Sequence, residues 1–562
     1  GYSTEDIMKN EKALKHLDKV KGNQKNVEKK IAKAMGKKKF NVKQNLSIVA
    51  NIISAEVAYG DIDVIESVSE VEKVVVETQY DPATSAEAAA PQMAVAASVM
   101  TGAKQAWEEG FTGAGSRLAI IDTGLDIDHQ SFNNDAFNYA IAEDAAKAGM
   151  DVDTYKAEVL KFLTAEEITE AMPYLNAYAR SGGKLTAADV TISEKIPYGY
   201  NYVDKNTNVR HIKDTQGEHG SHVAGISTAN RYIVKDGECV DAMATVGVAG
   251  NAPDAQILVM KVFGQGGGAY DSDYMAAIED AIVLNCDSVN LSLGSGNAGM
   301  SSSGTYQAIM DKLVETDTVV VMSAGNSGAW ADETTYGYLY DDGVNYATNG
   351  SPGSFTNSLS VASVENAGQF GTTFTVGGKD FGYTETNGYG NDPLASIAGE
   401  YEYVLVKGVG EPSDFEGIDV AGKVVFCYRG AISFFEKANN AVAAGAIATV
   451  IVNNQAGSIS MNLDGYKYKA PCVSILQAYG DAIIASSTSV NDGQYYTGTL
   501  TINSEPQVIM YGDDHYTMSS FSSFGVPGDL SLKPEISAPG GSIWSVNGSN
   551  NAGGGVDQYE LM

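Results

Sequence analysis

The stretch LAIIDTGLDIDH, residues 118–129, decides the fold class of this chain. Four apolar residues lead directly into Asp122, and a continuous apolar run is typical of a parallel strand buried on both faces. Similar runs follow at AQILVMKVF (255–263), DSVNLSLG (287–294) and TVVVMSAGNSG (318–328). We therefore expect an α/β domain with a doubly wound parallel sheet, whose site lies at the carboxyl ends of the strands.

One crossover helix between these runs is well marked. In DSDYMAAIEDAI either Asp271 or Ser272 can cap the N-terminus, and the apolar residues that follow recur at helical spacing. The residues on that face are Tyr274, Ala277, Ile278, Ala281 and Ile282. Residues 133–200 interrupt the strand pattern, and their sequence predicts a polar, helical insertion.

The N-terminal part predicts a small α+β unit ahead of the sheet. Residues 5–39 are rich in Lys, Glu and Ala and predict a helix, whereas NLSIVANII (45–53) and VEKVVVETQY (71–80) predict strands. From Asp81 to about Ala97 the Pro, Ala and Ser content is typical of a linker. A chain of 562 residues is long enough for two to four domains.

A second interruption of the strand pattern runs from about residue 367 to residue 510. Within it GKVVFCYRG, FFEKANNAVAAGAIATVIVNN and APCVSIL predict a self-contained β–α–β–β arrangement. The earlier pattern returns at SSFSSFG (519–525). An inserted domain whose two ends lie near each other explains this order.

The charge of the chain is unevenly distributed. Residues 1–45 hold 13 Lys against 5 Asp or Glu, a net charge of +8, which leaves −41 on the rest of a chain whose total is −33. The acidic body argues against nucleic acid as a partner. The two parts are expected to attract each other, and a merely solvated Lys-rich helix is the alternative.

Membrane and disulfide signals are weak in this sequence. No run of about 18 apolar residues occurs, and the N-terminus lacks the apolar core of a signal peptide and does not begin with Met, so we expect it to have been trimmed. The four cysteines are too scattered for a disulfide framework or a metal cluster. Cys427 and Cys472 could pair, and buried thiols are the alternative.

Two candidate catalytic side chains stand at the ends of predicted elements. Asp122 ends a strand within D-T-G, a motif shared with aspartic peptidases, but no second D-T-G or D-S-G supplies the other carboxylate. His219 opens a helical run in GEHGSHVAGI (217–226). With His222 it forms a His-x-x-His pair that suggests zinc, yet no third ligand lies at a familiar spacing and H-E-x-x-H is absent.

Two further stretches are suited to binding a peptide and its reacting carbonyl group. Asn326 lies at the tip of a small-residue turn after an apolar run, where its amide could donate to an oxyanion. Ser292, Leu293 and Gly294 end another run, and such small residues allow an extended peptide to pair with the backbone.

Taken in order, and together with APG in SLKPEISAPGGSIWSV (531–546), these stretches resemble the subtilisin-like serine peptidases. The resemblance covers about residues 96–365 and 513–562. It implies that Asp122 is the aspartate of the catalytic triad, His219 the general base and Asn326 the oxyanion-hole side chain. Ser292 to Gly294 would then form the wall of the primary specificity pocket, and His222 would be structural.

The resemblance extends to the flanking parts. Residues 367–510 are similar to a protease-associated domain, and this combination resembles the secreted bacterial cell-envelope proteinases of the lactocepin type. Residues 1–85 resemble the later part of a propeptide that acts as an intramolecular inhibitor, cut somewhere near residues 80–96. Residues 86–366 and 511–562 would form the two parts of the catalytic domain. The implied location is extracellular or the cell envelope.

The family's nucleophile lies in a G-T-S-M-A segment, which this sequence lacks. The position of the nucleophile is not matched by any of the serines at 301–303, 351, 354 and 519–523. We therefore expect the serine just after Met562, beyond VDQYELM (556–562), and we expect the chain as it stands to be inactive. A nucleophile-free pseudopeptidase that binds peptides or acts as a scaffold is the alternative, and a zinc hydrolase is a third hypothesis.

The expected partners are protein or peptide substrates, with no cofactor needed for the chemistry. Calcium is common in the family and is a candidate structural ligand here. The acidic spot YGDDH (511–515) does not define a ligand set, so the metal sites stay unknown.

Overall fold

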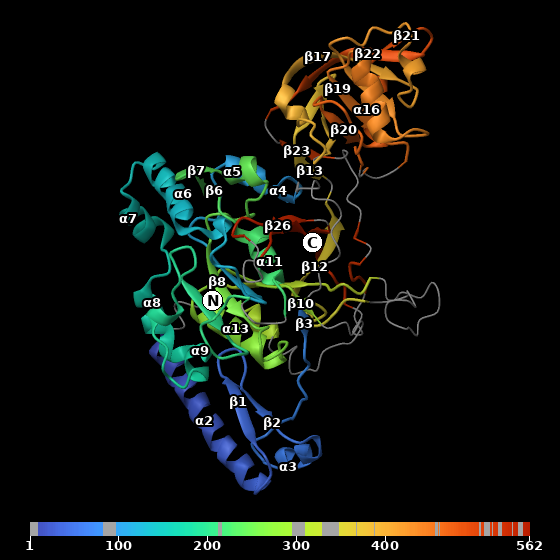
Figure 1. Cartoon of the computed structure of the whole chain (residues 1–562). Coiled ribbons are helices and arrows are strands. Elements are labelled where there is room, and N and C mark those ends of the chain that lie inside the picture. Colours follow the sequence, from blue (N-terminus) through green and yellow to red (C-terminus); the bar gives the residue numbers. More distant parts are fainter. Residues whose placement is uncertain are drawn as a thin grey trace. The chain divides into compact units, whose positions relative to one another are not determined.

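The computed structural model divides the chain into two compact units (Figure 1). Unit 1 comprises Gly1–Ala89, Ala97–Asn366 and His515–Met562, and unit 2 comprises Ala90–Ala96 and Ala367–Asp514. The residues that the structure describes are 9–82, 97–211, 216–294, 310–328, 348–366, 368–386, 388–455, 459, 461–504, 507–510, 518–519, 521–525, 531–541, 543–548 and 555–562.

Unit 1 is built on a sheet of seven strands whose neighbours all pair in parallel. In spatial order the strands are β24 (Ile536–Gly541), β12 (Leu359–Glu365), β11 (Val319–Ser323), β9 (Ser288–Leu291), β4 (Arg117–Asp122), β8 (Gln256–Lys261) and β5 (Tyr198–Asn201). Strands β4, β8, β9 and β11 lie within the four apolar runs, so the predicted α/β fold with a doubly wound parallel sheet is confirmed.

Helices cover both faces of this sheet. Ala119 and Ile121 of β4 belong to the same apolar cluster as α13 (Asp271–Val283), whereas Ile120 packs in a different cluster that contains Ala224 of α11 (His219–Thr228). Successive residues of a strand point to opposite faces, so α13 and α11 lie on opposite sides of β4. Both helices are therefore held against the strand that ends in Asp122.

The N-cap of α13 is one residue earlier than predicted. Tyr270 has extended backbone angles, and its N–H donates to the carboxylate of Asp273 at 3.1 Å, which closes the first turn. Asp271 and Ser272 are thus the first helical residues and not the cap. The predicted apolar face is confirmed, because Tyr274, Ala277, Ile278, Ala281 and Ile282 are all buried.

The segment between β4 and β5 is helical, as expected for the insertion at residues 133–200. Its helices are α6 (Asn134–Lys147), α7 (Val152–Thr154), a π-helical turn at Tyr155–Leu160, α8 (Ala165–Ala171), a 3₁₀ turn at Met172–Tyr174, α9 (Asn176–Arg180) and α10 (Ala187–Val190). The insertion ends in β5, the edge strand of the main sheet.

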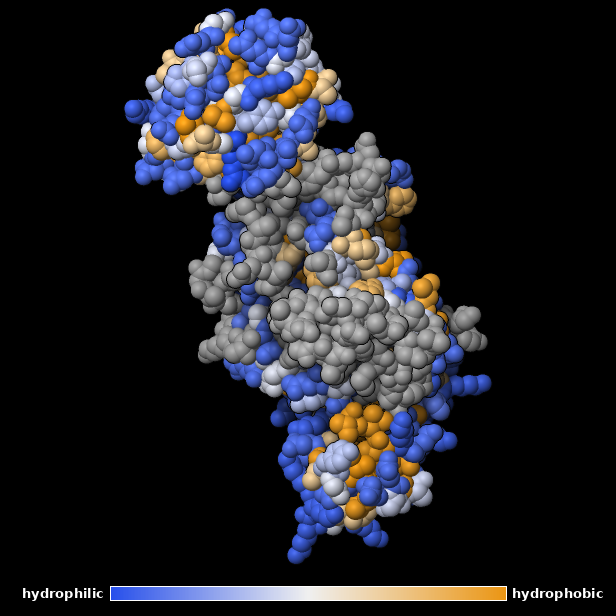
Figure 2. All heavy atoms as spheres, turned by 90° about the vertical axis from the view of Figure 1, so that its right-hand side faces the viewer, coloured by the Kyte–Doolittle hydropathy of each residue, from blue (hydrophilic) through white to orange (hydrophobic). Residues whose placement is uncertain are grey.

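The N-terminal segment, residues 9–82, folds as a helix against a hairpin. It contains α2 (Glu11–Met35), β1 (Asn41–Leu46), β2 (Ile52–Glu56), α3 (Ile62–Glu66) and the two-residue strand β3 (Asp81–Pro82). The helix predicted at 5–39 is confirmed over Glu11–Met35. Figure 2 shows exposed apolar side chains on the face of this segment that is turned to the viewer.

Two strand predictions in this segment are wrong. Residues 47–51 do not continue the strand expected at 45–53 but connect β1 to β2, because the N–H groups of Ser47 to Ala50 donate to a carboxylate of α13. Residues 71–78 form no strand, and beyond them only a single bridge at Gln79 precedes β3.

Unit 2 contains a mixed sheet flanked by α16 (Phe434–Ala443) and α17 (Gln477–Ala485). The predicted β–α–β–β arrangement occurs as β18 (Val424–Tyr428), α16, β19 (Ala448–Val452) and β20 (Cys472–Ile475). The strands of this sheet are β14 (Thr373–Val376), β15 (Lys379–Gly382), β16 (Thr384–Glu385), β17 (Gly399–Val406), β18 (Val424–Tyr428), β19 (Ala448–Val452), β20 (Cys472–Ile475), β21 (Thr488–Val490) and β22 (Tyr495–Ile502).

The two ends of unit 2 lie side by side. β13 (Gly368–Gly371) and β23 (Gln507–Met510) pair in antiparallel register, which suits a segment inserted into another domain. Cys427 and Cys472 are free, buried thiols in this unit, and burial raises the pKa of both, that of Cys427 to about 12. The pairing alternative for these cysteines is therefore wrong.

Unit 1 also contains several short α-helices and strands. They are α4 (Ala97–Met100), α5 (Ala103–Glu108), the hairpin β6 (Tyr232–Lys235) and β7 (Glu238–Asp241), α12 (Ala242–Val246), β10 (Leu293–Gly294), and the antiparallel pair β25 (Trp544–Val546) and β26 (Tyr559–Leu561).

Candidate active site

Asp122 and His219 meet at the carboxyl end of the central strand. Asp122 is the last residue of β4 and is 1% exposed, and His219 is the first residue of α11 with 17% of its side chain exposed. His219 Nδ1 lies 3.0 Å from both carboxylate oxygens of Asp122. The carboxylate therefore holds the imidazole in one orientation and leaves Nε2 as the nitrogen that can accept a proton.

The residue after His219 allows this contact. A Cβ atom at Gly220 would overlap the carbonyl oxygen of Gly124, so only glycine lets α11 approach the loop that follows β4 so closely. The N–H of Gly220 donates to the hydroxyl of Thr123 at 2.9 Å, and Ser221 Oγ accepts the N–H of Asp126 at 2.8 Å. These contacts fix the start of α11 against the end of β4.

The two histidines of the His-x-x-His pair have different surroundings. Burial lowers the pKa of His219, but the negative charge of Asp122 and its hydrogen bond outweigh this and raise the pKa above its ordinary value. Burial lowers the pKa of His222 to about 4, and its Nε2 lies 3.0 Å from the carbonyl oxygen of Ile543. His222 thus stays neutral and links α11 to the segment before β25.

Among the described ranges, no group of three or more His, Cys, Asp or Glu residues is arranged to hold a metal ion. His219 is engaged with Asp122 and His222 with a backbone carbonyl, so the pair does not converge on one point. The acidic spot at 511–515 lies outside the residues that the structure describes.

Asn326 is exposed in the loop that follows β11. The loop is fixed from the C-terminal part of the chain, because Ser523 Oγ accepts the N–H of Ser327 at 2.9 Å and the N–H of Ser523 donates to Gly325 O at 2.8 Å. β11 and β4 are separated only by β9 and run parallel, so both strands end at the same edge of the sheet, β4 in Asp122 and β11 just before the loop that contains Asn326.

The predicted peptide-binding residues lie on a backbone edge that carries an extended segment. Leu293 and Gly294 form β10, which pairs in antiparallel register with Pro82 and Asp81 of β3. Ser292 does not belong to this pair, and its hydroxyl accepts the side-chain N–H of Asn290 at 2.9 Å. Residues 81–82 therefore form a backbone pair with the edge, Leu293 and Gly294, that the sequence predicted to bind an extended peptide.

A second backbone edge contacts the same segment just before β3. Gln79 bridges Tyr270 in antiparallel fashion, and the N–H of Tyr80 donates to Ala269 O at 2.7 Å. A Cβ atom at Gly268 would overlap the carbonyl oxygen of Tyr80, so glycine is required for this approach. Residues 79–82 are thus bound through their backbone along two edges of unit 1.

A buried glutamate of α13 binds the hairpin loop of the N-terminal segment. Glu279 is 1% exposed, and burial raises the pKa of its carboxyl group although five donors surround it. Its Oε1 accepts the N–H groups of Ile48 (2.8 Å), Val49 (2.9 Å) and Ala50 (3.3 Å), and its Oε2 accepts Asn176 Nδ2 (3.0 Å) and the N–H of Ser47 (3.3 Å).

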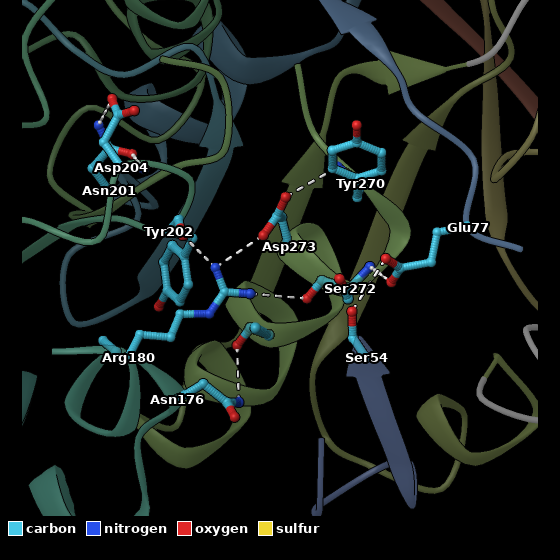
Figure 3. A network of polar contacts seen from close by, with 12 residues as sticks. Ser54, Glu77, Asn176, Arg180, Asn201, Tyr202, Asp204, Tyr270, Ser272 and Asp273 are labelled. Carbon is cyan, nitrogen blue, oxygen red and sulfur yellow. Dashed lines mark hydrogen bonds and ion pairs between the residues drawn. The ribbon is translucent and has the colours of Figure 1, made fainter. Parts of the chain in front are cut away.

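The N-terminus of α13 is contacted from two sides (Figure 3). The carboxylate of Glu77 accepts the N–H of Ser272 at 3.1 Å and the hydroxyl of Ser54 at 3.2 Å, which places a negative charge at the positive end of the helix. From the insertion, Arg180 donates to Asp273 at 2.9 Å and to Ser272 O at 3.2 Å. The insertion and the N-terminal segment therefore share α13.

The lysines of the N-terminal segment are paired mostly within that segment. In the part of the chain that the structure describes, Lys30 pairs with Glu70, Lys38 with Asp61, and Lys39 and Lys43 with Glu56. Lys21 faces the body and lies 5.8 Å from the ring centroid of Tyr174. The N-terminal segment is thus attached to the rest of unit 1 by the bonds between Glu279 and backbone N–H groups more than by attraction between its lysines and the acidic remainder of the chain.

The candidate serines that are described are buried or have partners other than His219. Ser354 is buried, Ser351 Oγ lies 3.5 Å from the Tyr80 hydroxyl, and Ser523 holds the Asn326 loop. No described serine hydroxyl is hydrogen-bonded to His219 Nε2. The serines at 301–303 and the linker at 83–96 lie outside the described residues.

Several residues of this region were missed in the sequence. Glu279 occurs in an otherwise apolar helix, and a charged residue at such a position was the available signal. Tyr80 ends the N-terminal segment immediately before Asp-Pro, where composition indicated only a linker.

Within the described ranges, no helix has the length and apolar character needed to cross a membrane.

Comparison with known proteins identifies close similarities over most of the chain. The family model named Subtilase family matches residues 113–560. The PII-type proteinase of Lacticaseibacillus paracasei is 30% identical over 528 residues, which cover 90% of this chain and 24% of that protein.

Two other relatives match a smaller share of the chain. The minor extracellular protease Vpr of Bacillus subtilis (strain 168) is 28% identical and matches 83% of this chain and 46% of its own length. The C5a peptidase of Streptococcus pyogenes serotype M3 (strain ATCC BAA-595 / MGAS315) is 27% identical and matches 79% of this chain and 33% of its own length. The chain thus spans between about a quarter and a half of these relatives.

Proposed function

The chain belongs to the subtilase family, and from this premise we propose that the whole protein is a serine endopeptidase that uses Asp122, His219 and Asn326. Members of this family act on proteins or peptides. The observation that carries the proposal is the 3.0 Å contact of His219 Nδ1 with both oxygens of the buried Asp122 at the carboxyl end of β4.

The proposed mechanism is acyl transfer to a serine. His219 Nε2 takes the proton of the serine hydroxyl as the oxygen attacks the peptide carbonyl, and it then gives that proton to the leaving amine. Asp122 keeps the imidazole oriented and stabilises the imidazolium. Asn326 donates its amide N–H to the oxyanion, a contact whose loss generally lowers kcat by about 10²- to 10³-fold.

We assign the attacking serine to a position outside these 562 residues and expect the chain by itself to be inactive. Two observations support this: the sequence has no G-T-S-M-A segment, and no described serine hydroxyl reaches His219. The proposed chemistry uses no cofactor. We propose structural calcium sites only for the whole protein.

Residues 1–85 are proposed to be an inhibitory propeptide. Residues 81 and 82 pair with Leu293 and Gly294, the backbone edge that was predicted to bind substrate, so they would exclude a peptide from it. Residues 367–510 are proposed to be a protease-associated domain. One relative is named an extracellular protease, and we propose that this protein also acts outside the cell or at its envelope.

The test is hydrolysis of casein by the whole protein and its variants. Asp122→Asn should lower kcat by about 10⁴-fold, because the imidazole loses the partner that sets its tautomer, and His219→Ala should do at least as much. Asp128→Asn is a matched control, since this carboxylate is half exposed and pairs with Arg210. Retention of full activity by Asp122→Asn would overturn the assignment.

The same measurement separates the two functional classes. A whole protein that binds casein peptides but never hydrolyses them would be a pseudopeptidase, and the contact between Asp122 and His219 would then be structural. Hydrolysis that disappears in both variants would exclude that alternative.

A further inference from the structure

We propose that the site holding Tyr80 selects a tyrosine side chain in bound peptides, with Asp271 as the residue that recognises the phenol hydroxyl. The residues that contact Tyr80 in this site include Ala269, Asp271 and Tyr274. This inference rests on the proposed function, because it treats residues 79–82 as bound in the manner of a substrate.

The site encloses the whole aromatic side chain. Tyr80 is 1% exposed and packs in the same apolar cluster as Ala269, Tyr274 and Leu293. Its ring meets that of Tyr274 edge to face, with centroids 5.5 Å apart and an interplanar angle of 82°. An aromatic pair of this geometry adds to the burial of apolar area, so a small side chain would leave a cavity here.

A buried carboxylate lies at the end of the ring. Asp271 is 1% exposed, and its Oδ1 accepts the hydroxyl of Tyr80 at 2.8 Å and that of Tyr274 at 2.9 Å. Its Oδ2 accepts the N–H of Thr78 at 2.6 Å. Burial and the charge of Asp271 raise the pKa of Tyr80, which keeps its hydroxyl protonated as the donor.

The backbone contacts and the side-chain contact have different consequences for selectivity. The bonds of Tyr80 N–H to Ala269 O and the pairing of residues 81–82 with β10 involve only backbone groups, so any residue except proline can form the first of them. The contacts of the Tyr80 hydroxyl depend on side-chain chemistry, and the shorter of them is the 2.8 Å bond to Asp271, against 3.5 Å to Ser351 Oγ. Selectivity along this segment is therefore concentrated at Tyr80.

Removal of the hydroxyl would leave the buried Oδ1 of Asp271 with one donor fewer. A site built to hydrogen-bond a hydroxyl discriminates strongly against the analogue that lacks it, because its own polar group loses a partner that water cannot replace. We therefore expect tyrosine to be preferred to phenylalanine by about 10- to 100-fold. Lysine and arginine could reach the carboxylate but would forgo the edge-to-face contact with Tyr274.

The experiment is hydrogen exchange of the full chain, followed by mass spectrometry of peptides that cover residues 77–82. Tyr80→Phe should accelerate exchange there by about 10- to 100-fold. In an Asp271→Ala background the same change should matter less than about threefold, because the acceptor of the Tyr80 hydroxyl is then absent. Exchange of β8 in the same samples reports whether unit 1 remains folded.

Tyr270→Phe is the matched control. Tyr270 is the residue next to Asp271, but it is 42% exposed and its hydroxyl lies 3.5 Å from Gln79 Oε1. This variant should leave exchange at residues 77–82 within about twofold of the unaltered chain. Equal exchange in Tyr80→Phe and Tyr270→Phe would overturn the proposal, as would slower exchange in Tyr80→Lys or Tyr80→Arg than with tyrosine.

A second measurement extends the test to a peptide in solution. The peptides VETQYDP, which is residues 76–82, and VETQFDP compete with casein for the whole protein, and the first should inhibit about tenfold more strongly or better. Equal inhibition would overturn the proposed selectivity. Absence of any hydrolysis would instead contradict the proposed function, and the exchange experiment on the chain would still decide the role of Asp271.

Discussion

Replacement of Glu279 by glutamine should loosen the attachment of the N-terminal segment to α13. Glu279 is the acceptor for four consecutive backbone N–H groups of the loop between β1 and β2, and for the amide of Asn176. Glutamine has nearly the same volume, so the packing of α13 should persist while the charge and one acceptor atom are lost.

The magnitude follows from these contacts. Whichever way the amide turns, its NH₂ group faces N–H donors, so at least two donors lose an acceptor at about 1 kcal/mol each. The remaining bonds become neutral, which removes about 1 kcal/mol from each of up to three bonds. A neutral side chain is less costly to bury, and this offsets about half of the sum. The net loss of about 2–3 kcal/mol increases the detached fraction by about 30- to 150-fold.

Limited digestion of the full chain by trypsin measures that fraction. Helix α2 carries many of the lysines of the N-terminal segment, and cleavage within it requires the segment to open. When opening and closing are fast compared with cleavage, the cleavage rate follows the open population. Glu170→Gln is the control, because Glu170 is an exposed residue of α8. A change of less than about threefold in Glu279→Gln, with the control unaltered, would refute this account of the attachment.

Three further outcomes are expected. Asp122→Asn should move the pKa of His219 from above its ordinary value to below it, because burial lowers this pKa and the charge of Asp122 raises it. NMR titration of the imidazole measures the pKa, and an unchanged value would contradict the pairing of the two residues. Burial raises the pKa of Asp280 from 3.8 to about 7. Protonation of Asp280 therefore contributes a few kcal/mol to the stability of the fold below pH 3.8, and this contribution is lost as the pH rises through 7. Asp280→Asn should therefore flatten the pH dependence of the Tm of unit 1 over that window, and an equally steep dependence would exclude Asp280 as its source. A fluorophosphonate probe should not label the 562-residue chain, and labelling that Ser351→Ala abolishes would place a nucleophile where none is expected.

The catalytic pair could be predicted from the sequence because its parts lie at the ends of regular elements. An apolar run that stops at Asp122 and a helix that begins at His219 are local patterns, and a parallel sheet brings strand ends to one edge. The approach of α11 could also be anticipated from the glycine that follows His219. Spacing alone did not give the 3.0 Å contact, since the two residues are 97 positions apart along the chain and the helical insertion lies between them.

The attachment of the N-terminal segment could not be predicted in the same way. Its main contacts join backbone N–H groups to Glu279 and backbone edges to residues 79–82, and backbone donors are identical in every sequence. Charge composition suggested lysines as the link, but Lys30, Lys38 and Lys39 pair within their own segment. The strand expected at 45–53 failed for the same reason, because its central N–H groups bind a carboxylate from another part of the chain.

The sequence by itself determined the parallel sheet, the family resemblance and the positions of Asp122 and His219, because these follow from local periodicity and short motifs. Tertiary structure decided how α13 is shared between the insertion and the N-terminal segment, and that Tyr80 reaches Asp271 from 191 positions away along the chain. Such contacts form because a buried donor or acceptor needs a hydrogen-bond partner, which can come from a distant part of the chain. Which groups become buried is decided only when the whole chain has folded.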